Sequence, residues 1–407
     1  MKLFLAIIVF LSITKNTTFS LSFNKDTDTT ISLIQTLSNL CEKLNIFSQK
    51  NSEADIINLW KIDSFFRGAN IHPYMHFSPF SMRNPITEKD LIELKKLGAN
   101  LVVANYTGVF TYFPPYQIDS LSLANLDNIV NLTEKLNLFL VISLRSGPGR
   151  SLYSFFDKYR EDEFLFYDSL AQEKYIEMCR FISERYSKKK HLVGINFLLE
   201  PHGDDPVNLE PIKDSIYFNF VEKLIREIRK VNCRIPIIVQ PQGWAYPDKF
   251  TSLKKFDDEK IVYSFDMYFP HSFTNEKNDS SYPGFYFDRD TLVFVDSIYL
   301  EKFLKPVIDF KNNYNVPIFV NEYGGIRYKK GILNYLKDLH EIFLKFGFHF
   351  AFYVWKSEWG ETDGRKFDEY NYEKGFVLDR DQNSDKDIRN NELLEELKRV
   401  WKTKRND

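Results

Sequence analysis

Short apolar runs alternate with amphipathic segments along most of the chain. Eight runs of strand length begin at residue 65: Phe65–His72, Leu101–Thr107, Phe139–Arg145, Leu192–Glu200, Pro236–Gln240, Ile261–Tyr268, Pro317–Tyr323 and Phe350–Trp355. Apolar runs with few charges are typical of strands that are buried on both faces, as in a parallel sheet. We therefore expect eight parallel strands.

Helix-like segments separate these runs. They are Thr87–Leu97, Leu123–Asn137, Ala171–Ser187, Lys213–Val231, Ser297–Tyr314 and Lys330–Phe346, with a weak candidate at 248–256 and a closing helix at Asn391–Lys402. Thr87 followed by Asp90 is a typical helix start. Strands that alternate with helices predict a (β/α)8 barrel, or TIM barrel, as a single domain over residues 61–402. An open doubly wound sheet is the alternative, but no Gly-x-Gly-x-x-Gly follows the first strand.

Two regions lie outside this alternation. Residues 1–22 have a charged start and an apolar run, Leu3–Ile13, that is short for a membrane span. They predict a signal peptide and a secreted or periplasmic protein, with an uncleaved N-terminal anchor as the alternative. Residues 23–60 form a lead-in with a helix near 31–44. The long loop at 269–296 is expected on the active face of the barrel.

Composition narrows the classes of function. The net charge of −2 gives no strong attraction to nucleic acid or to an anionic membrane. Three cysteines leave at least one thiol unpaired, which argues against a disulfide scaffold. No Cys-x-x-Cys or His/Cys cluster is present, so we expect neither a metal nor another cofactor. The oligomeric state is not predicted.

Two of the apolar runs end on a glutamate. Glu200 is followed by Pro201, which favours an extended backbone at Glu200, and Glu322 is followed by Tyr323 and a glycine pair. In a parallel barrel the carboxyl ends of the strands carry the active site. Two facing carboxyl groups are what glycoside hydrolysis requires. The alternative for each is a glutamate that only caps its strand.

The strings around these residues resemble the cellulase-type glycoside hydrolases of family 5, in the clan of retaining (β/α)8 glycosidases, over about residues 60–380. The resemblance is carried by Phe66-Arg67-Gly68-Ala69-Asn70-Ile71, Leu199-Glu200-Pro201-His202, Asp266-Met267-Tyr268-Phe269-Pro270, Asn321-Glu322-Tyr323-Gly324 and Trp355. It implies that Glu200 is the acid/base and Glu322 the nucleophile. It also implies that Tyr268 contacts the nucleophile and that Trp355 lies under the bound sugar.

Four neighbours of the two glutamates differ from the family pattern. Asn105 stands near the place of an arginine, and Leu199 replaces the asparagine before the acid/base. Asp266 replaces the histidine of His-x-Tyr. Arg145 replaces a histidine, in a string similar to the Arg-x-Gly-Pro of the β-galactosidases of family 35.

These substitutions give specific expectations for the site. We expect the carboxyl groups of Glu200 and Glu322 to lie about 5–5.5 Å apart, the spacing of a retaining enzyme. Burial and the charge of Glu322 would raise the pKa of Glu200 so that it can act as an acid. Tyr268 would donate a hydrogen bond to Glu322, and Arg145 would supply a charge-assisted one.

Several further residues have an open role. Leu199 cannot donate to a sugar 2-hydroxyl, and the candidate replacements are Asn196, Asn105 and Gln240. Asp266 would raise neighbouring pKa values, pair with Arg145 or bind a sugar hydroxyl. Each remaining candidate has a substrate-binding role and a structural role as alternatives. Trp355 is either a stacking floor for the sugar or part of the core, and Trp244 is either a wall of the cleft or part of the core. His202 either contacts the substrate or makes a structural hydrogen bond.

The sequence therefore predicts a retaining glycoside hydrolase that acts on a β-linked glucan-like or mannan-like glycan. Its partner is expected to be an oligo- or polysaccharide, with no nucleic acid, and no membrane beyond the N-terminal segment. A carbohydrate-binding pseudoenzyme on the same barrel, or a transglycosylase, is the alternative.

Overall fold

The computed structural model describes residues 55–72, 86–150, 164–202, 212–276, 278–326, 329–356, 376–377, 386–387 and 392–402. By its contacts the chain divides into Met1–Glu53 and Ala54–Asp407, and only the second unit contains described residues. The predicted signal peptide at 1–22 and the helix near 31–44 lie outside them. Within the described ranges, no helix has both the length and the apolar character needed to cross a membrane.

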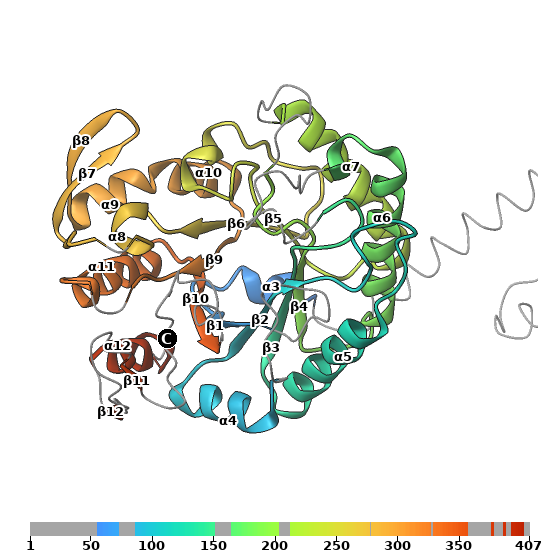
Figure 1. The fold of residues 1–407 in the computed structure, drawn as a ribbon, viewed down its shortest axis with the longest axis horizontal. Helices are drawn as coiled ribbons and strands as arrows, with labels where there is room; N and C mark the ends of the chain where they lie inside the picture. The colour runs from blue at the N-terminus through green and yellow to red at the C-terminus, as the bar shows by residue number, and fades with distance from the viewer. Residues whose placement is uncertain are drawn as a thin grey trace, which may run out of the picture. The chain divides into compact units, whose positions relative to one another are not determined.

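Eight parallel strands close into a barrel, which confirms the predicted (β/α)8 fold (Figure 1). In order around the barrel they are β1 (Arg67–Ile71), β2 (Leu101–Thr107), β3 (Phe139–Leu144), β4 (Leu192–Asn196), β5 (Ile237–Val239), β6 (Ile261–Met267), β9 (Ile318–Tyr323) and β10 (His349–Lys356), which pairs with β1. The predicted strands match these within a few residues, apart from the end of β4. The buried, largely uncharged runs identified them because both faces of each strand are covered.

Helices surround the barrel. They are α4 (Glu88–Leu97), α5 (Ser120–Lys135), α6 (Ser169–Arg185), α7 (Asp214–Val231), α9 (Ser297–Phe303), α10 (Lys305–Tyr314), α11 (Ile332–Lys345) and α12 (Glu392–Lys402), with short 3-10 helices at Phe164–Phe166 and Pro247–Thr251. The start of α4 is capped reciprocally by Thr87 and Asp90, as predicted. The single helix predicted over 297–314 is two, because Pro306, the second residue of α10, lacks the backbone N–H that would continue α9.

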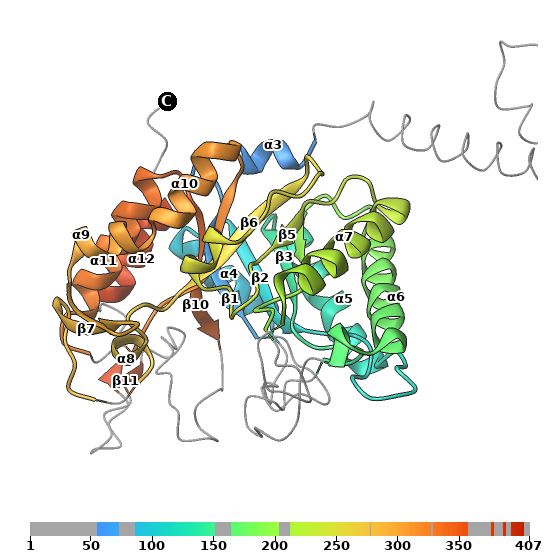
Figure 2. The same ribbon diagram turned by 90° about the horizontal axis from the view of Figure 1, so that it is seen from above.

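The segment predicted as a long loop at 269–296 has regular structure. It contains the short helix α8 (His271–Thr274) and a hairpin of β7 (Gly284–Asp288) and β8 (Thr291–Val295). Figure 2 shows β7 and α8 on the opposite side of the barrel from α3 (Ile57–Trp60). Tyr286 is buried while Phe285 and Phe287 are exposed. Because both faces of the hairpin carry apolar residues, the polar alternation that identifies a strand is missing. A further short pair, β11 (Phe376–Val377) and β12 (Lys386–Asp387), was also not predicted.

The interior of the barrel is apolar at the end where the strands begin. Helix α3 covers this end, and Trp60 packs against Phe66 with ring centroids 4.5 Å apart. The indole of Trp60 donates a hydrogen bond to the carbonyl of Val193 at 2.8 Å. Higher in the barrel the buried side chains become polar, with Asn70, Ser143, Asn196, Ser264 and Asn321. Buried polar side chains are therefore more frequent toward the end that carries the candidate site, although His349 at the start of β10 is buried beside Trp60 and binds its carbonyl at 2.8 Å.

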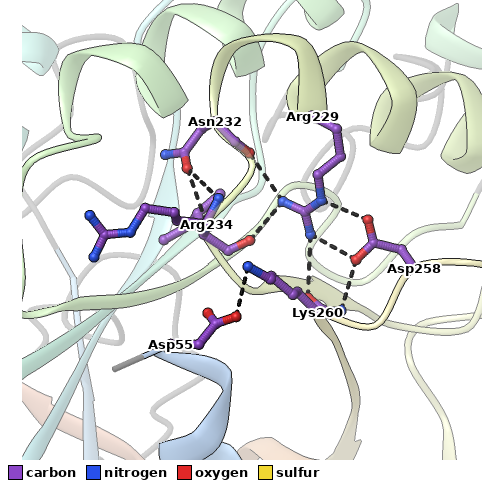
Figure 3. Close-up of polar contacts among 7 residues, drawn as sticks. Asp55, Arg229, Asn232, Arg234, Asp258 and Lys260 are labelled. Carbon is purple, nitrogen blue, oxygen red and sulfur yellow. Dashed lines mark hydrogen bonds and ion pairs between the residues drawn. The ribbon is translucent and has the colours of Figure 1, made fainter. Parts of the chain in front are cut away.

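A polar cluster fixes the lower rim between α7 and β6 (Figure 3). Arg229 donates to Asp258 at 2.6 Å and to the carbonyls of Asn232 and Ile235 at 3.2 and 2.8 Å. Burial alone would raise the pKa of Asp258, but the hydrogen bonds and charge of Arg229 outweigh it, so that the pKa is lowered. The cluster therefore joins the end of α7 to the loops that precede β5 and β6.

We expect Arg229→Met to lower the free energy of unfolding by about 2–4 kcal/mol, because it removes the guanidinium that pairs with Asp258 and donates to two carbonyls. Arg185→Met is the matched control. Its pair with Asp127 is 40% and 28% exposed, and its loss should cost less than about 1 kcal/mol. Urea denaturation at neutral pH measures both.

The lowered pKa of Asp258 gives this prediction a pH dependence. The stabilisation that ionised Asp258 gives the folded state is complete above the pKa of an aspartate in the unfolded chain. It is lost as the pH falls through the lower pKa of Asp258 in the folded state. The difference between wild type and Arg229→Met should therefore narrow in acid. Equal destabilisation by the two variants at neutral pH would contradict the role given to Arg229.

Candidate active site

Three carboxyl groups meet at the end of the barrel where the strands finish. One carboxylate oxygen each of Glu200, Asp266 and Glu322 lies within 4.8 Å of the others. Glu322 belongs to β9 and Asp266 to β6, and Glu200 follows β4 by four residues. The structure thus brings both predicted glutamates together, and it adds Asp266 to the same cluster.

A register shift in β9 directs Glu322 into the barrel. Phe265 pairs with Val320, but the next residue, Asp266, pairs with Glu322, so that Asn321 is extra. Asn321 also faces inward, since its side-chain oxygen accepts a hydrogen bond from Ser143 of β3 at 3.3 Å. An irregularity of this kind lets two consecutive side chains point to the same side, and such bulges are common beside active sites.

Glu322 is almost completely buried and is held by two neutral donors. The hydroxyl of Tyr268 donates to Oε2 at 2.9 Å, and the side-chain amide of Asn105 donates to Oε1. Burial and the charge of Glu200 raise the pKa of Glu322 well above its usual range, and the two hydrogen bonds act in the opposite direction. Glu322 therefore ionises at a higher pH than a free glutamate.

Asn105 is a donor to Glu322, and the charge-assisted hydrogen bond from Arg145 to Glu322 stays a prediction. The Arg145 side chain is fully buried. The pKa of His202 is lowered well below its usual range, mainly by burial and further by the charges of Arg145 and Arg150. Asn105 was considered for a sugar hydroxyl, but its position at the end of β2 places its amide on the candidate nucleophile.

Glu200 lies on a bend and not on the strand. β4 ends at Asn196, and Glu200 has a φ of 48°, so the prediction that the strand reaches Glu200 with an extended backbone is wrong. A left-handed backbone at a residue other than glycine costs about 1–3 kcal/mol and needs support from its surroundings. Gln240 supplies part of it, because its Oε1 accepts a hydrogen bond from the Glu200 N–H at 2.7 Å.

Arg150 supplies a further part of this support, and the sequence did not single it out. Its guanidinium is fully buried and donates to the carbonyls of Leu199 and Glu200 at 2.7 and 2.9 Å. The available signal was weak. Arg150 directly follows the Gly147-Pro148-Gly149 turn, and a second arginine so close to a strand end had no partner identifiable by spacing.

Asp266 is buried and tied to the same amide. The Nε2 of Gln240 donates to Oδ1 of Asp266 at 3.0 Å, so Gln240 links Asp266 to the backbone of Glu200. Burial, then the charges of Glu322 and Glu200, raise the pKa of Asp266 well above its usual range, against the opposite effects of the Gln240 side chain and the backbone N–H of Glu322. Among the roles predicted for Asp266, an electrostatic coupling to the two glutamates fits this position.

Trp244 lies beside Glu200 at the mouth of the barrel. Its indole is 43% exposed and stacks on the ring of His202, with centroids 3.3 Å apart and planes within 14°. The Nδ1 of His202 donates to the carbonyl of Glu200 at 2.9 Å, so His202 is a structural hydrogen-bond donor there. One face of the indole is therefore supported while part of the side chain remains accessible, as a cleft wall requires.

Trp355 has a different environment from the one predicted. It is 2% exposed, its indole donates to the carbonyl of Asp90 in α4 at 3.0 Å, and it belongs to the core between strands and helices. A role as a stacking floor does not fit this placement. The aromatic residue that β10 turns to the mouth is Tyr353, whose hydroxyl pairs with His72 at 2.8 Å and whose ring contacts Tyr268.

The three carboxyl groups are also a set that could hold a hard cation. Neutral donors already occupy part of this set, however, since Asn105, Tyr268 and Gln240 direct N–H or O–H groups at the carboxylate oxygens of Glu322 and Asp266. A cation would have to displace these donors. We therefore assign the cluster to proton and carboxylate chemistry.

Comparisons with known proteins agree with this geometry. The model of the family described as cellulase (glycosyl hydrolase family 5) matches residues 63–358. Endoglucanase C of Acetivibrio thermocellus is 26% identical over 298 residues, which are 65% of this chain and 82% of that protein.

Two solved structures show the same fold. The cellulose synthase subunit Z (CcsZ) of Clostridioides difficile has a TM-score of 0.60 at 21% identity, covering 82% of this chain and 99% of that one. Thermotoga maritima Cel5A in complex with mannotriose has a TM-score of 0.59 at 16% identity, covering 84% and 100%. At these identities the likeness is one of architecture.

Asn105→Ala should raise the pKa of Glu322 further, because the variant loses a hydrogen bond that favours the ionised form. Carbon-13 NMR of labelled glutamate carboxyls measures it, with the Glu322 signal assigned by its loss in Glu322→Gln. Ser264→Ala, a buried change at similar depth on β6, is the control and should leave this pKa in place. An unchanged pKa in Asn105→Ala would refute the contact.

Proposed function

Because the chain belongs to glycosyl hydrolase family 5, and so hydrolyses O-glycosyl bonds, we propose that it cleaves β-linked glucans with retention of the anomeric configuration. The observation that carries this proposal is the approach of Glu200 and Glu322, with a carboxylate oxygen of one within 4.8 Å of the other. Retaining enzymes separate their carboxyl groups by about 5–5.5 Å, and inverting enzymes by about 6.5–9.5 Å to admit a water.

In the first step Glu322 acts as the nucleophile. One of its oxygens forms a bond with the anomeric carbon, and the bond from that carbon to the glycosidic oxygen breaks. Glu200 gives its proton to the departing oxygen. Tyr268 and Asn105 hold the attacking carboxylate and favour its ionised form before attack.

In the second step the roles of Glu200 reverse. The ionised Glu200 takes a proton from a water, whose oxygen bonds to the anomeric carbon while the bond to Glu322 breaks. Both residues return to their starting protonation states. The fixed backbone of Glu200 serves both steps, because the same carboxyl must reach the leaving oxygen and then the water.

A glucan is favoured over a mannan as substrate. The relative named above is an endoglucanase, whereas mannotriose enters only through a structure whose likeness to this chain is one of fold. Trp244 is 43% exposed and stacks on His202, which is hydrogen-bonded to the carbonyl of Glu200. Such a surface suits the apolar face of a sugar ring. Secretion, expected from residues 1–22, remains a prediction.

Glu322→Ala should lower kcat on an aryl β-glucoside or cello-oligosaccharide by about 10⁴-fold or more, because no other group at its position can form the covalent intermediate. Glu200→Ala should lower kcat by about 10²–10⁴-fold on substrates with poor leaving groups, and less where the leaving group needs no proton. Glu301→Ala, a surface change, is the control. Proton NMR of the first-formed anomer tests retention, and an inverted product would refute the mechanism.

Trp244→Ala should raise KM for longer oligosaccharides by about 2- to 10-fold while kcat changes little, since one stacking contact contributes about 0.5–1.5 kcal/mol. The effect should vanish for an aryl monoglycoside that does not reach the indole. Phe285→Ala, which removes an exposed aromatic ring from the β7–β8 hairpin, is the matched control. A loss shared by long and short substrates would show that Trp244 acts through His202 and Glu200 instead.

A further inference from the structure

The candidate site holds one carboxyl group more than double displacement requires. Asp266 faces Glu322 directly, since the register shift in β9 makes the two residues cross-strand partners. It is 2% exposed, and one of its oxygens lies within 4.8 Å of an oxygen of Glu200 and of Glu322. Neither glycosidic step uses a third acid. The presence of Asp266 at this depth therefore needs an explanation of its own.

Asp266 is linked to the acid/base through one amide. Its Oδ1 accepts from the Nε2 of Gln240 at 3.0 Å, and the Oε1 of Gln240 accepts from the backbone N–H of Glu200 at 2.7 Å. Its own N–H donates to the carbonyl of Ala245 at 3.0 Å. The amide of Gln240 is thereby fixed in one orientation, with its oxygen toward Glu200 and its nitrogen toward Asp266.

We propose that Asp266 is a positioning residue that keeps its proton in the active enzyme. In this neutral form its Oδ1 still accepts from Gln240 and so holds the bend at Glu200, while Glu322 is the ionised member of the cluster. This inference rests on the proposed function for the reaction that it serves, and deepens it by assigning the third carboxyl group.

The charges around Asp266 support the neutral form. Glu322 faces it from β9 and Glu200 from the segment after β4, whereas Gln240, which directly follows β5, and Tyr268, which directly follows β6, bring no charge. The buried arginines Arg145 and Arg150 act on His202, and Arg150 donates to backbone carbonyls. Ionised Asp266 would place a second negative charge beside the nucleophile in a buried site, where such charges repel strongly.

The hydrogen bonds around Asp266 also support a proton on its carboxyl group. Within the described residues, Oδ2 of Asp266 is buried and has no hydrogen-bond partner. A carboxylate would leave a charged oxygen without a donor there, which is costly in a buried site. A carboxylic acid with its proton on Oδ2 carries no charge there and turns a donor toward the two neighbouring glutamates, which each have a carboxylate oxygen within 4.8 Å of one of the Asp266 oxygens.

Asp266→Asn and Asp266→Ala separate the two parts of the proposal. The asparagine copies the neutral acid and can still accept from Gln240, so it should lower kcat by about 3- to 10-fold, whereas alanine should lower it by about 10- to 100-fold. If Asp266 is neutral in wild type, the acid limb of the kcat/KM profile of Asp266→Asn should lie within about 0.3 pH unit of the acid limb of wild type. If Asp266 were ionised, removal of its charge would move both limbs to lower pH, and the proposal would fail.

The link through Gln240 has a test of its own. Gln240→Leu and Asp266→Ala should each lower kcat more than they raise KM, and their combination should cost little more than either alone, because both break one chain of contacts. Thermal denaturation of each variant checks that it is folded. Full additivity, or an Asp266→Ala variant as active as wild type, would overturn the positioning role.

A direct measurement keeps this inference separate from the proposed reaction. Carbon-13 NMR of labelled aspartate carboxyls, with the Asp266 signal assigned by its loss in Asp266→Asn, reports protonation without any substrate. We expect the shift of a carboxylic acid throughout the pH range in which Glu322 becomes ionised. The shift of a carboxylate in that range would overturn the proposal, even if the glycosidase activity were confirmed. The shift of a carboxylic acid at Asp266 would support the inference even if the substrate class proved different.

Discussion

Burying three carboxyl groups within 4.8 Å of one another is unfavourable, because each loses its water and each charge repels the others. The chain meets this constraint with neutral donors. Asn105 and Tyr268 bind the two oxygens of Glu322, and Gln240 binds one oxygen of Asp266. The number of negative charges that the cluster can carry is therefore small, and its protonation state is part of its structure.

The rest of the barrel holds these donors in position. The lower interior is largely apolar and is closed by Trp60 of α3, and buried polar side chains are more frequent toward the opposite end. There the backbone departs from regular geometry twice. An extra residue in β9 directs Glu322 inward, and a bend after β4 presents Glu200 with a φ of 48°. Both departures are fixed by hydrogen bonds from neighbouring segments, and neither would persist on an isolated strand.

The strands and the two glutamates could be predicted from the sequence because buried parallel strands are continuous apolar runs and catalytic residues follow their ends. Trp355 could not be placed in this way. Between Ala69 and Ile71 of β1, the pairing on β10 advances from Phe352 to Lys356, so counting alternate residues from the strand start fails. Tyr353 faces the mouth and Trp355 the helices. The donor on Glu322 also depends on geometry, since Asn105 lies near the end of β2 and only the folded structure shows that its amide reaches Glu322.

Neutral donors around the nucleophile have a consequence for pH. A cation beside Glu322 would lower its pKa strongly, whereas hydrogen bonds from Asn105 and Tyr268 only partly offset the increase due to burial and to Glu200. In the proposed mechanism Glu322 must be ionised to attack, so we expect activity to be lost on the acid side at a higher pH than for a free glutamate. A third ionised carboxyl would move that limit higher still. A proton retained on Asp266 keeps the nucleophile charged at pH values where the acid/base still holds its own proton, and this explains how a site with three acids and neutral donors can serve a reaction that needs one of each form.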